Sequence, residues 1–139
     1  AYGLVGGEAN AIQGGKRPLS SMTPTIVFKG GEPFLATGSP GGSRIITMVL
    51  QILLNVIDHS LNIAEATAAV RIHHQWLPDK LFVERGLGPD TLALLRQRGH
   101  NVVISRAAGS VQSVMRLANG DGFLGASDPR SQGALTAGY

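Results

Sequence analysis

Short apolar runs and glycine-containing turns alternate along much of this chain. Residues 25–28 and 33–37 are apolar and flank a polar turn with two consecutive glycines, a pattern that predicts a β-hairpin. Residues 111–117 and 123–126 flank the turn sequence Asn-Gly-Asp-Gly and predict a second hairpin. Two further apolar runs, at residues 81–84 and 102–104, predict single strands.

The longest apolar stretch covers residues 44–60, and its apolar side chains occupy every side of a helix. Such a helix is either deeply buried or spans a membrane. This one is short for a span and contains Gln51, Asn55 and Asp58, so we expect a buried helix and no membrane span in this chain. Covering it on all sides needs more elements than the remaining sequence supplies, so we expect a partner or a further segment.

Capping and helix-breaking residues delimit two shorter helices. Asn62, with Glu65 three residues later, is typical of a capping box and predicts a helix over residues 63–70. A Gly-Pro-Asp sequence starts a second helix over residues 88–98, and Gly99 ends it. The mixture of hairpins and helices, with no βαβ repeat, predicts an α+β fold.

Composition narrows the class of protein. The chain has 139 residues, of which 43% are hydrophobic and 15% charged, which excludes a disordered polyampholyte. No linker or repeat divides it, so we expect one domain over residues 1–139 that opens with an extended loop over residues 1–21. The net charge is +3, but the cations are spread evenly, so we expect no nucleic-acid partner. With no cysteine, a disulfide scaffold and a thiolate metal site are excluded, and no motif predicts a cofactor or a metal.

Gly41 and Gly42 form the strongest candidate site, in the sequence Gly-Ser-Pro-Gly-Gly-Ser-Arg between a predicted strand and the long helix. Consecutive glycines before a helix leave backbone N–H groups accessible, and the helix start adds partial positive charge, which favours an anion or oxyanion. The loop lacks both the Walker ending and the Gly-x-Gly-x-x-Gly spacing. A tight turn that needs glycine for its geometry alone explains the pattern equally well, so both interpretations stay open.

Ser20 and Ser21 place two adjacent hydroxyl groups just before a predicted strand. Neighbouring hydroxyls on a loop can both donate to a carboxylate. A polar loop that enters a strand is the more common explanation of such a pair.

The remaining polar candidates indicate structure rather than chemistry. His73 and His74 are adjacent and lack a partner at the spacing that chelates a metal, so we expect structural or hydrogen-bonding histidines. Arg130 lies in a turn-forming sequence, where it can pair with a carboxylate. By themselves these residues supply no convincing nucleophile or general base.

Several of these stretches together resemble the small subunit of gamma-glutamyltransferase (gamma-glutamyltranspeptidase). They include Tyr-Gly-Leu-Val-Gly-Gly at residues 2–7, Lys-Arg-Pro-Leu-Ser-Ser-Met-Thr-Pro-Thr-Ile at 16–26 and Thr-Gly-Ser-Pro-Gly-Gly-Ser-Arg-Ile-Ile at 37–46. His-His-Gln-Trp-Leu-Pro at 73–78 and Ala-Ser-Asp-Pro-Arg-Ser at 126–131 continue the resemblance to the final Leu-Thr-Ala-Gly-Tyr. The resemblance therefore covers essentially the whole chain.

This resemblance implies an N-terminal-nucleophile hydrolase fold, an αββα sandwich shared by two subunits cut from one precursor, with the large subunit as the partner of this chain. In the family, the first residue of the small subunit is a threonine that attacks the γ-glutamyl carbonyl of glutathione or a related amide, with its own α-amine as base. Water or an acceptor amine then resolves the γ-glutamyl ester. Gly41 and Gly42 match the oxyanion-hole glycines, and Ser20 and Ser21 match the pair that binds the substrate α-carboxylate with an arginine of the large subunit. The bacterial family implies a periplasmic or secreted location.

The chain departs from the family pattern at its beginning, because Ala1 falls downstream of the nucleophilic threonine. We therefore expect a C-terminal fragment of the small subunit that is inactive by itself. One alternative is a related acylase with another acyl group, such as a cephalosporin (glutaryl) acylase or a poly-γ-glutamate transpeptidase. The Ser20–Ser21 pair disfavours it, because the pair favours a substrate with a free α-carboxylate. The other alternative is a non-catalytic binding domain.

Overall fold

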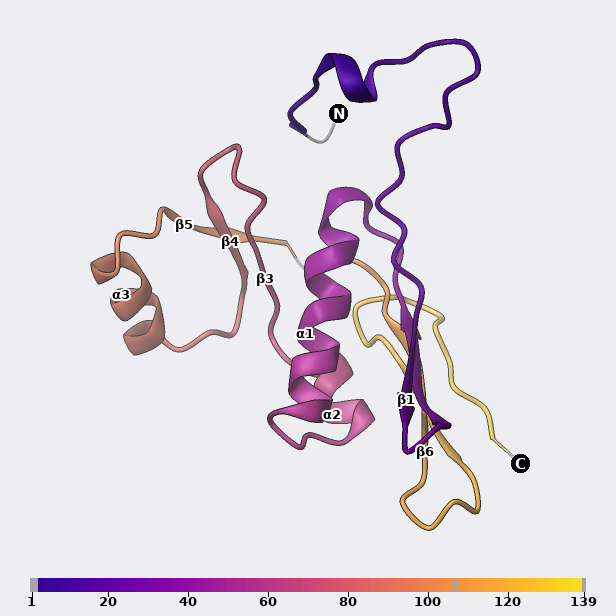
Figure 1. The fold of residues 1–139 in the computed structure, drawn as a ribbon. Coiled ribbons are helices and arrows are strands. Elements are labelled where there is room, and N and C mark those ends of the chain that lie inside the picture. The colour runs from indigo at the N-terminus through magenta and orange to yellow at the C-terminus, as the bar shows by residue number, and fades with distance from the viewer. Residues whose placement is uncertain (1–2, 107, 139) are drawn as a thin grey trace.

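Two β-sheets lie on opposite sides of a central helix, α1 (Ile45–Ile57), in a computed structural model that describes residues 3–106 and 108–138 (Figure 1). The mixture of helices and sheets confirms the predicted α+β class. A second helix, α2 (Ile63–Ala68), packs against α1 and against the four-stranded sheet. No helix in the described ranges is long and apolar enough to cross a membrane.

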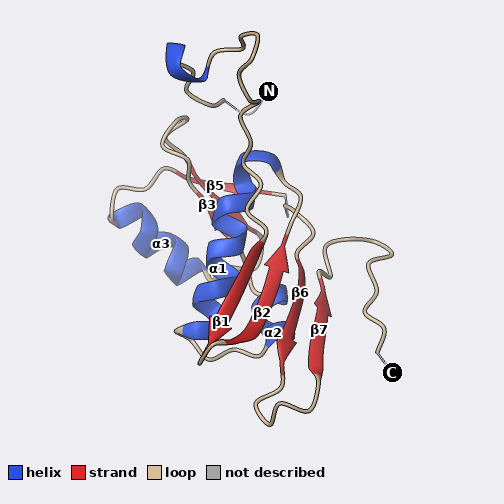
Figure 2. Ribbon diagram, turned by 45° about the vertical axis from the view of Figure 1, so that its right-hand side comes forward, coloured by secondary structure: helices blue, strands red, loops and turns tan. Residues whose placement is uncertain are grey.

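The larger sheet is fully antiparallel and has the strand order β1-β2-β6-β7 (Figure 2). Both predicted hairpins are confirmed, because β1 (Thr25–Lys29) pairs with β2 (Glu32–Gly38) and β6 (Gln112–Arg116) pairs with β7 (Phe123–Ser127). The turn of the first hairpin uses Gly30 and Gly31 with φ angles of 61° and 86°, the left-handed conformation that tight hairpin turns require. The long-range pairing of β2 with β6 joins the two hairpins into one sheet.

The hydrophobic core lies between this sheet and the two helices. Burial of one fully covered aliphatic side chain contributes about 1.5–3 kcal/mol, so this layer holds the helices on the sheet. The predicted capping box is confirmed at the start of α2, where Asn62 Oδ1 accepts from Glu65 N at 2.9 Å and Glu65 Oε2 accepts from Asn62 N at 3.1 Å. The buried members of the core are Leu35, Ile45, Met48, Val49, Ile52, Val56, Ile63, Ala66, Val111 and Ala126.

Helix α1 is buried along one side only, which corrects the expectation of a helix covered all round. Its opposite side carries an apolar stripe that the described residues leave about half exposed. The apolar periodicity predicts the helix correctly, but the two sheets and α2 leave this stripe uncovered. The helix also ends three residues earlier than predicted, at Ile57. The stripe, called the α1 stripe below, consists of Ile46, Leu50, Leu54 and Ile57.

The smaller sheet has the order β3-β4-β5 and contains a parallel pair. Strand β4 (Leu81–Glu84), helix α3 (Pro89–Gln97) and strand β5 (Val102–Ser105) form one βαβ unit, which the sequence analysis did not anticipate. The two strands and the helix were predicted individually, and Gly99 ends α3 with a φ of 89°. Strand β3 (Ile72–His73) is too short to show an apolar period and was missed.

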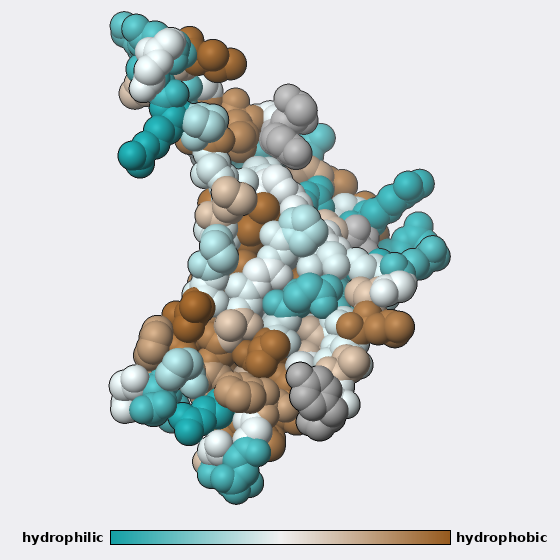
Figure 3. All heavy atoms as spheres, turned by 90° about the vertical axis from the view of Figure 1, so that its right-hand side faces the viewer, coloured by the Kyte–Doolittle hydropathy of each residue, from teal (hydrophilic) through white to brown (hydrophobic). Residues whose placement is uncertain are grey.

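The C-terminal segment lies against the larger sheet at β7, where Thr136 Oγ1 is 2.8 Å from Ser127 Oγ. Apolar side chains gather on the lower part of the molecule in the view of Figure 3. Ile26, Phe28 and Val114, all on strands of this sheet, are exposed. Residues 3–24 run outside both sheets and contain only one short 3-10 turn, η1 (Glu8–Asn10), which agrees with the predicted extended segment. Ala1 and Tyr2, which belong to the same prediction, lie outside the described residues.

Candidate active site

The Gly41–Gly42 loop connects β2 to α1 through a 3-10 turn, η2 (Gly42–Arg44). Gly41 has a φ of 151° and Gly42 a φ of 59°, so both lie in the region that favours glycine. A Cβ atom at Gly41 would overlap Met48 Cε. The turn geometry therefore requires glycine at position 41 and favours it at position 42, whatever the loop binds.

The same turn leaves backbone donors available. In residues 3–106 and 108–138, no acceptor lies within hydrogen-bond distance of the N–H groups of Gly41 and Gly42. The two groups precede a 13-residue helix, whose amino end carries partial positive charge. Such an arrangement can stabilise a developing negative charge on a substrate oxygen.

The structure brings one of the two predicted serines to this loop. Ser21 Oγ donates to the carbonyl oxygen of Gly42 at 2.8 Å, although 21 residues separate them in sequence. Ser20 points elsewhere: it is exposed, and its Oγ accepts from the Met22 N–H at 3.2 Å. The hydroxyl pair and the glycine pair, predicted separately, are therefore neighbours through Ser21.

A second segment, residues 108–111, packs against the Gly41–Gly42 loop and the residues that precede it. Ser39 Oγ accepts from Ser110 N at 3.1 Å and donates to Pro40 O at 2.8 Å. A Cβ atom at Gly109, whose φ is 81°, would overlap Met48 Sδ. Met48 thus fills the space between two glycine backbones and ties the loop to the core.

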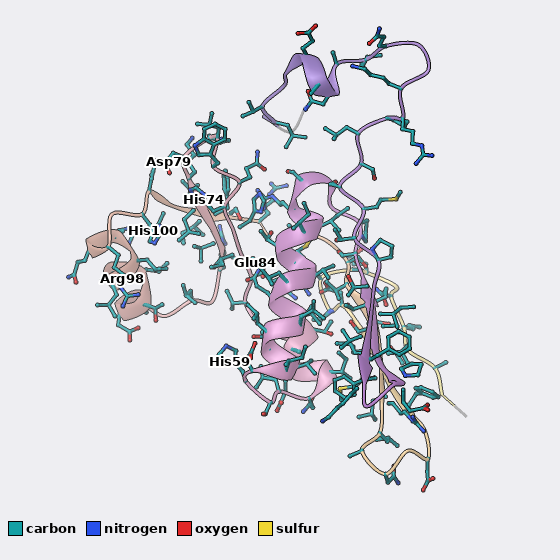
Figure 4. The ribbon with its side chains drawn as sticks, viewed as in Figure 1. His59, His74, Asp79, Glu84, Arg98 and His100 are labelled. Carbon is teal, nitrogen blue, oxygen red and sulfur yellow. The ribbon has the colours of Figure 1, made fainter. Side chains whose placement is uncertain are left out.

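The hydrogen-bonding role predicted for the two histidines is confirmed. His73 is buried, and its Nδ1 lies 2.8 Å from Thr47 Oγ1 while its Nε2 lies 2.9 Å from Gln75 Oε1. Burial lowers the pKa of His73, and the nearby charge of Arg44 adds to the effect, against a smaller opposing effect of the Gln75 hydrogen bond. His74 Nε2 lies 3.1 Å from Asp79 Oδ1 at the exposed β3–β4 connection (Figure 4). Among the described residues, no group of three or more His, Cys, Asp or Glu side chains could hold a metal ion.

Three buried charged side chains and a fourth that is 12% exposed, Arg130, form a cluster that sequence reasoning largely missed. Asp128 Oδ2 lies 2.7 Å from Arg71 Nη1, and Asp128 Oδ1 lies 3.1 Å from Arg130 Nη1. Arg130 Nη2 lies 2.7 Å from Glu84 Oε2, so the carboxylate pairing predicted for Arg130 is confirmed. We call Arg71, Glu84, Asp128 and Arg130 the buried ion cluster.

The buried ion cluster also holds the segment that supports the glycine loop. Glu84 Oε1 accepts from Ala108 N at 3.1 Å and Asp128 Oδ2 accepts from Val111 N at 2.8 Å. Burial alone would raise the pKa of each carboxyl, but hydrogen bonds from arginines and backbone N–H groups outweigh it, so the pKa of both is lowered. Both carboxylates are therefore ionised at neutral pH and anchor residues 108–111.

Comparison with known proteins identifies the family. The sequence profile described as gamma-glutamyltranspeptidase matches residues 1–138. The chain belongs to the gamma-glutamyltranspeptidase family. It is 62% identical over 138 residues to the glutathione hydrolase proenzyme of Escherichia coli K12, a match that covers 99% of this chain and 24% of that protein. It is 44% identical to the glutathione hydrolase proenzyme of Pseudomonas sp. A14, with coverage of 99% and 26%. The chain thus spans about a quarter of the length of these gamma-glutamyltranspeptidase relatives.

Solved structures agree with this family. A threonine-to-alanine mutant of Helicobacter pylori gamma-glutamyltranspeptidase superimposes with a TM-score of 0.90 and 52% identity, over 94% of this chain and 72% of that chain. The Bacillus anthracis transpeptidase CapD superimposes with a TM-score of 0.74 and 26% identity, over 89% and 75%. These matches confirm the α+β fold of the N-terminal-nucleophile hydrolase type.

Proposed function

We propose that this chain is the C-terminal part of the small subunit of a gamma-glutamyltransferase that also acts as a glutathione hydrolase. The family match and the names of the relatives support the proposal. The nucleophilic threonine and the large subunit would come from the parts of the protein that correspond to the remainder of the relatives. The word proenzyme in the relatives' names supports a precursor that is cut into two subunits.

The observation that carries the site assignment is the contact between Ser21 and Gly42. A γ-glutamyl group separates its α-carboxylate from its γ-carbonyl carbon by about 5 Å, from standard carbon–carbon bond lengths. Ser21 Oγ and the Gly42 carbonyl oxygen are 2.8 Å apart, so a substrate held by the serines reaches the glycine loop with its γ-carbonyl. In this role Ser20 and Ser21 bind the α-carboxylate, with the Ser21 hydroxyl turning from Gly42 O to the substrate, and Gly41 and Gly42 bind the oxyanion.

The reaction follows from these roles in two halves. The threonine hydroxyl adds to the γ-carbonyl, its proton passes to the threonine α-amine, and the N–H groups of Gly41 and Gly42 stabilise the resulting oxyanion. The carbon–nitrogen bond breaks, the leaving amine takes the proton, and a γ-glutamyl ester remains. Water or the amine of an amino acid or peptide then adds to the ester in the same way and regenerates the threonine. No cofactor or metal takes part in these steps.

The large subunit is the partner proposed for this chain, and it offers a cover for the α1 stripe. We place the complete protein in the periplasm or outside the cell, as in the bacterial family.

The second candidate activity is that of a related acylase or transpeptidase, which the similarity to CapD favours. At 26% identity, against 62% for the glutathione hydrolase relative, it is the weaker candidate.

Hydrolysis of chromogenic amides by the complete protein tests the proposed function. We expect release of p-nitroaniline from γ-glutamyl-p-nitroanilide and little from glutaryl-p-nitroanilide, which keeps a carboxylate at the position that Ser20 and Ser21 would bind but lacks the α-amine. A preference for the glutaryl amide would favour the related acylase. No turnover of either amide or of glutathione, by a folded and cleaved protein, would favour the binding domain.

A further inference from the structure

The beginning of α1 carries a set of side-chain hydrogen bonds that the proposed reaction does not use. Ser43 in η2 donates from Oγ to Gln75 Oε1 at 2.8 Å, and His73 Nε2 lies 2.9 Å from the same oxygen. His73 Nδ1 lies 2.8 Å from Oγ1 of Thr47, one helical turn after Ser43. We call these four residues the Ser43 cluster. It joins the start of the helix to β3 and the residue pair that follows it.

The network determines the proton positions in the Ser43 cluster. Gln75 Nε2 donates to Leu77 O at 3.0 Å, so the amide oxygen is the atom that faces Ser43 and His73. That oxygen can only accept, so Nε2 of His73 carries a proton. Because burial lowers the pKa of His73 and keeps the ring neutral, Nδ1 is free to accept from the hydroxyl of Thr47. That hydroxyl also lies 3.0 Å from Arg44 O and can donate its one hydrogen to either acceptor. The Gln75 amide and the His73 ring are therefore each held in one orientation.

The Ser43 cluster holds Ser43, the residue that directly follows the Gly41–Gly42 pair. The peptide unit between Gly42 and Ser43 is held on one side by Ser21, whose hydroxyl donates to Gly42 O, and on the other by Gln75, which accepts from Ser43 Oγ. Glycine has no side chain to restrict its own backbone, so Gly42 depends on such anchors for the direction of its N–H group. Backbone N–H groups of the turn itself also hold it, since Arg44 N donates to Gly41 O at 3.2 Å and Ile45 N donates to Gly42 O. Ser21 is proposed to bind substrate, so Gln75 is the side-chain anchor that takes no part in binding.

We infer that Gln75 and His73 are positioning residues, which set the direction of the Gly41 and Gly42 N–H groups through Ser43. The inference rests on the oxyanion role proposed for this loop. Oxyanion donors are effective only when aimed at the charge that develops in the transition state, and a displacement of about 1 Å can cost about 10²-fold in rate. Loss of the Ser43 cluster should therefore lower kcat and leave KM nearly unchanged, since other residues bind the α-carboxylate.

Steady-state kinetics of the complete protein with γ-glutamyl-p-nitroanilide test the inference. Ser43→Ala and Gln75→Met are each expected to lower kcat by about 10- to 100-fold, with KM changed by less than about threefold. Ser43→Thr keeps the hydroxyl and should restore most of kcat. Gln51→Met is the matched control, because Gln51 bonds only backbone groups, the Ile72 N–H at 2.9 Å, the Ile72 carbonyl at 2.8 Å and the Thr47 carbonyl at 2.7 Å. It so links α1 to β3 without touching the side chains of Ser43, His73 or Gln75.

The outcomes separate this inference from the proposed function. An active wild type whose Ser43→Ala and Gln75→Met variants keep their kcat overturns the positioning role and leaves the proposed function standing. An equal loss in Gln51→Met, or a loss confined to KM, assigns these residues a structural or binding role and overturns the inference as well. A folded, cleaved wild type without turnover refutes the proposed function, and the inference falls with it.

Discussion

Replacing Asp128 by asparagine should destabilise the protein strongly, although the two side chains have the same shape. Each carboxylate oxygen of Asp128 accepts two hydrogen bonds: Oδ1 from the N–H and Nη1 of Arg130, and Oδ2 from Arg71 Nη1 and Val111 N. An asparagine amide turns one oxygen into a donor, so in either orientation two of the four donors face another donor. The side chain is fully buried, so water cannot replace the lost acceptor. Removing one partner of a buried ion pair costs about 3–5 kcal/mol.

Scanning calorimetry and amide hydrogen exchange on the complete protein measure this effect. For a cooperative unit of 150–250 residues, about 3–5 kcal/mol corresponds to a fall in Tm of roughly 6–20 °C. The Val111 N–H should also exchange faster, because it loses its acceptor. Asp121→Asn, in the exposed turn between β6 and β7, is the control and should stay within about 0.5 kcal/mol of the wild type. A Tm for Asp128→Asn equal to that of the control, with Val111 still protected, would refute the reasoning.

Three further predictions concern acid stability, substrate binding and the oxyanion. The pKa of Glu84 and of Asp128 is lowered in the folded protein, so their contribution to stability is fully present above their ordinary pKa values of 4.5 and 3.8. That contribution is lost as the pH falls through the lowered values. Tm measured against pH should therefore fall in that range, and a flat profile there contradicts the prediction. Ser20→Ala and Ser21→Ala should each raise KM by about 10-fold or more, as expected for a lost hydrogen bond to a charged group, and unchanged KM values would count against both roles. Gly42→Pro removes an N–H donor and should lower kcat by at least about 10²-fold, so near-normal hydrolysis of γ-glutamyl-p-nitroanilide would exclude the oxyanion role.

Local signals in the sequence predicted most of the elements. The two hairpins follow from apolar runs around glycine turns, and the start of α2 follows from Asn62 and Glu65, because each signal lies within a few residues. The parallel pairing of β4 with β5 was not predicted, since a single βαβ unit produces no repeat. The cover of α1 was misjudged for a similar reason, because apolar periodicity reports which side chains avoid water but not which chain covers them.

In the candidate site, too, local features could be predicted from the sequence and long-range contacts could not. The Gly41–Gly42 turn and the pairing of Arg130 with a carboxylate could be predicted from short motifs. The partners Glu84 and Arg71 could not, because they are distant in sequence from Asp128 and Arg130, and nothing local marks them as buried. The contact of Ser21 with Gly42 likewise depends on tertiary structure. The one available hint for Glu84 was a carboxylate at the end of an otherwise apolar strand.

The α1 stripe determines how this protein has to be handled in the laboratory. The apolar side chains of the α1 stripe and those exposed on the larger sheet give an isolated chain two exposed apolar surfaces. A net charge of only +3 provides little electrostatic repulsion between copies of the chain. Contiguous apolar surface of this kind promotes aggregation unless another surface covers it. Recombinant expression of residues 1–139 without the rest of the protein should therefore yield inclusion bodies, whereas co-expression with the remaining segments should yield soluble material.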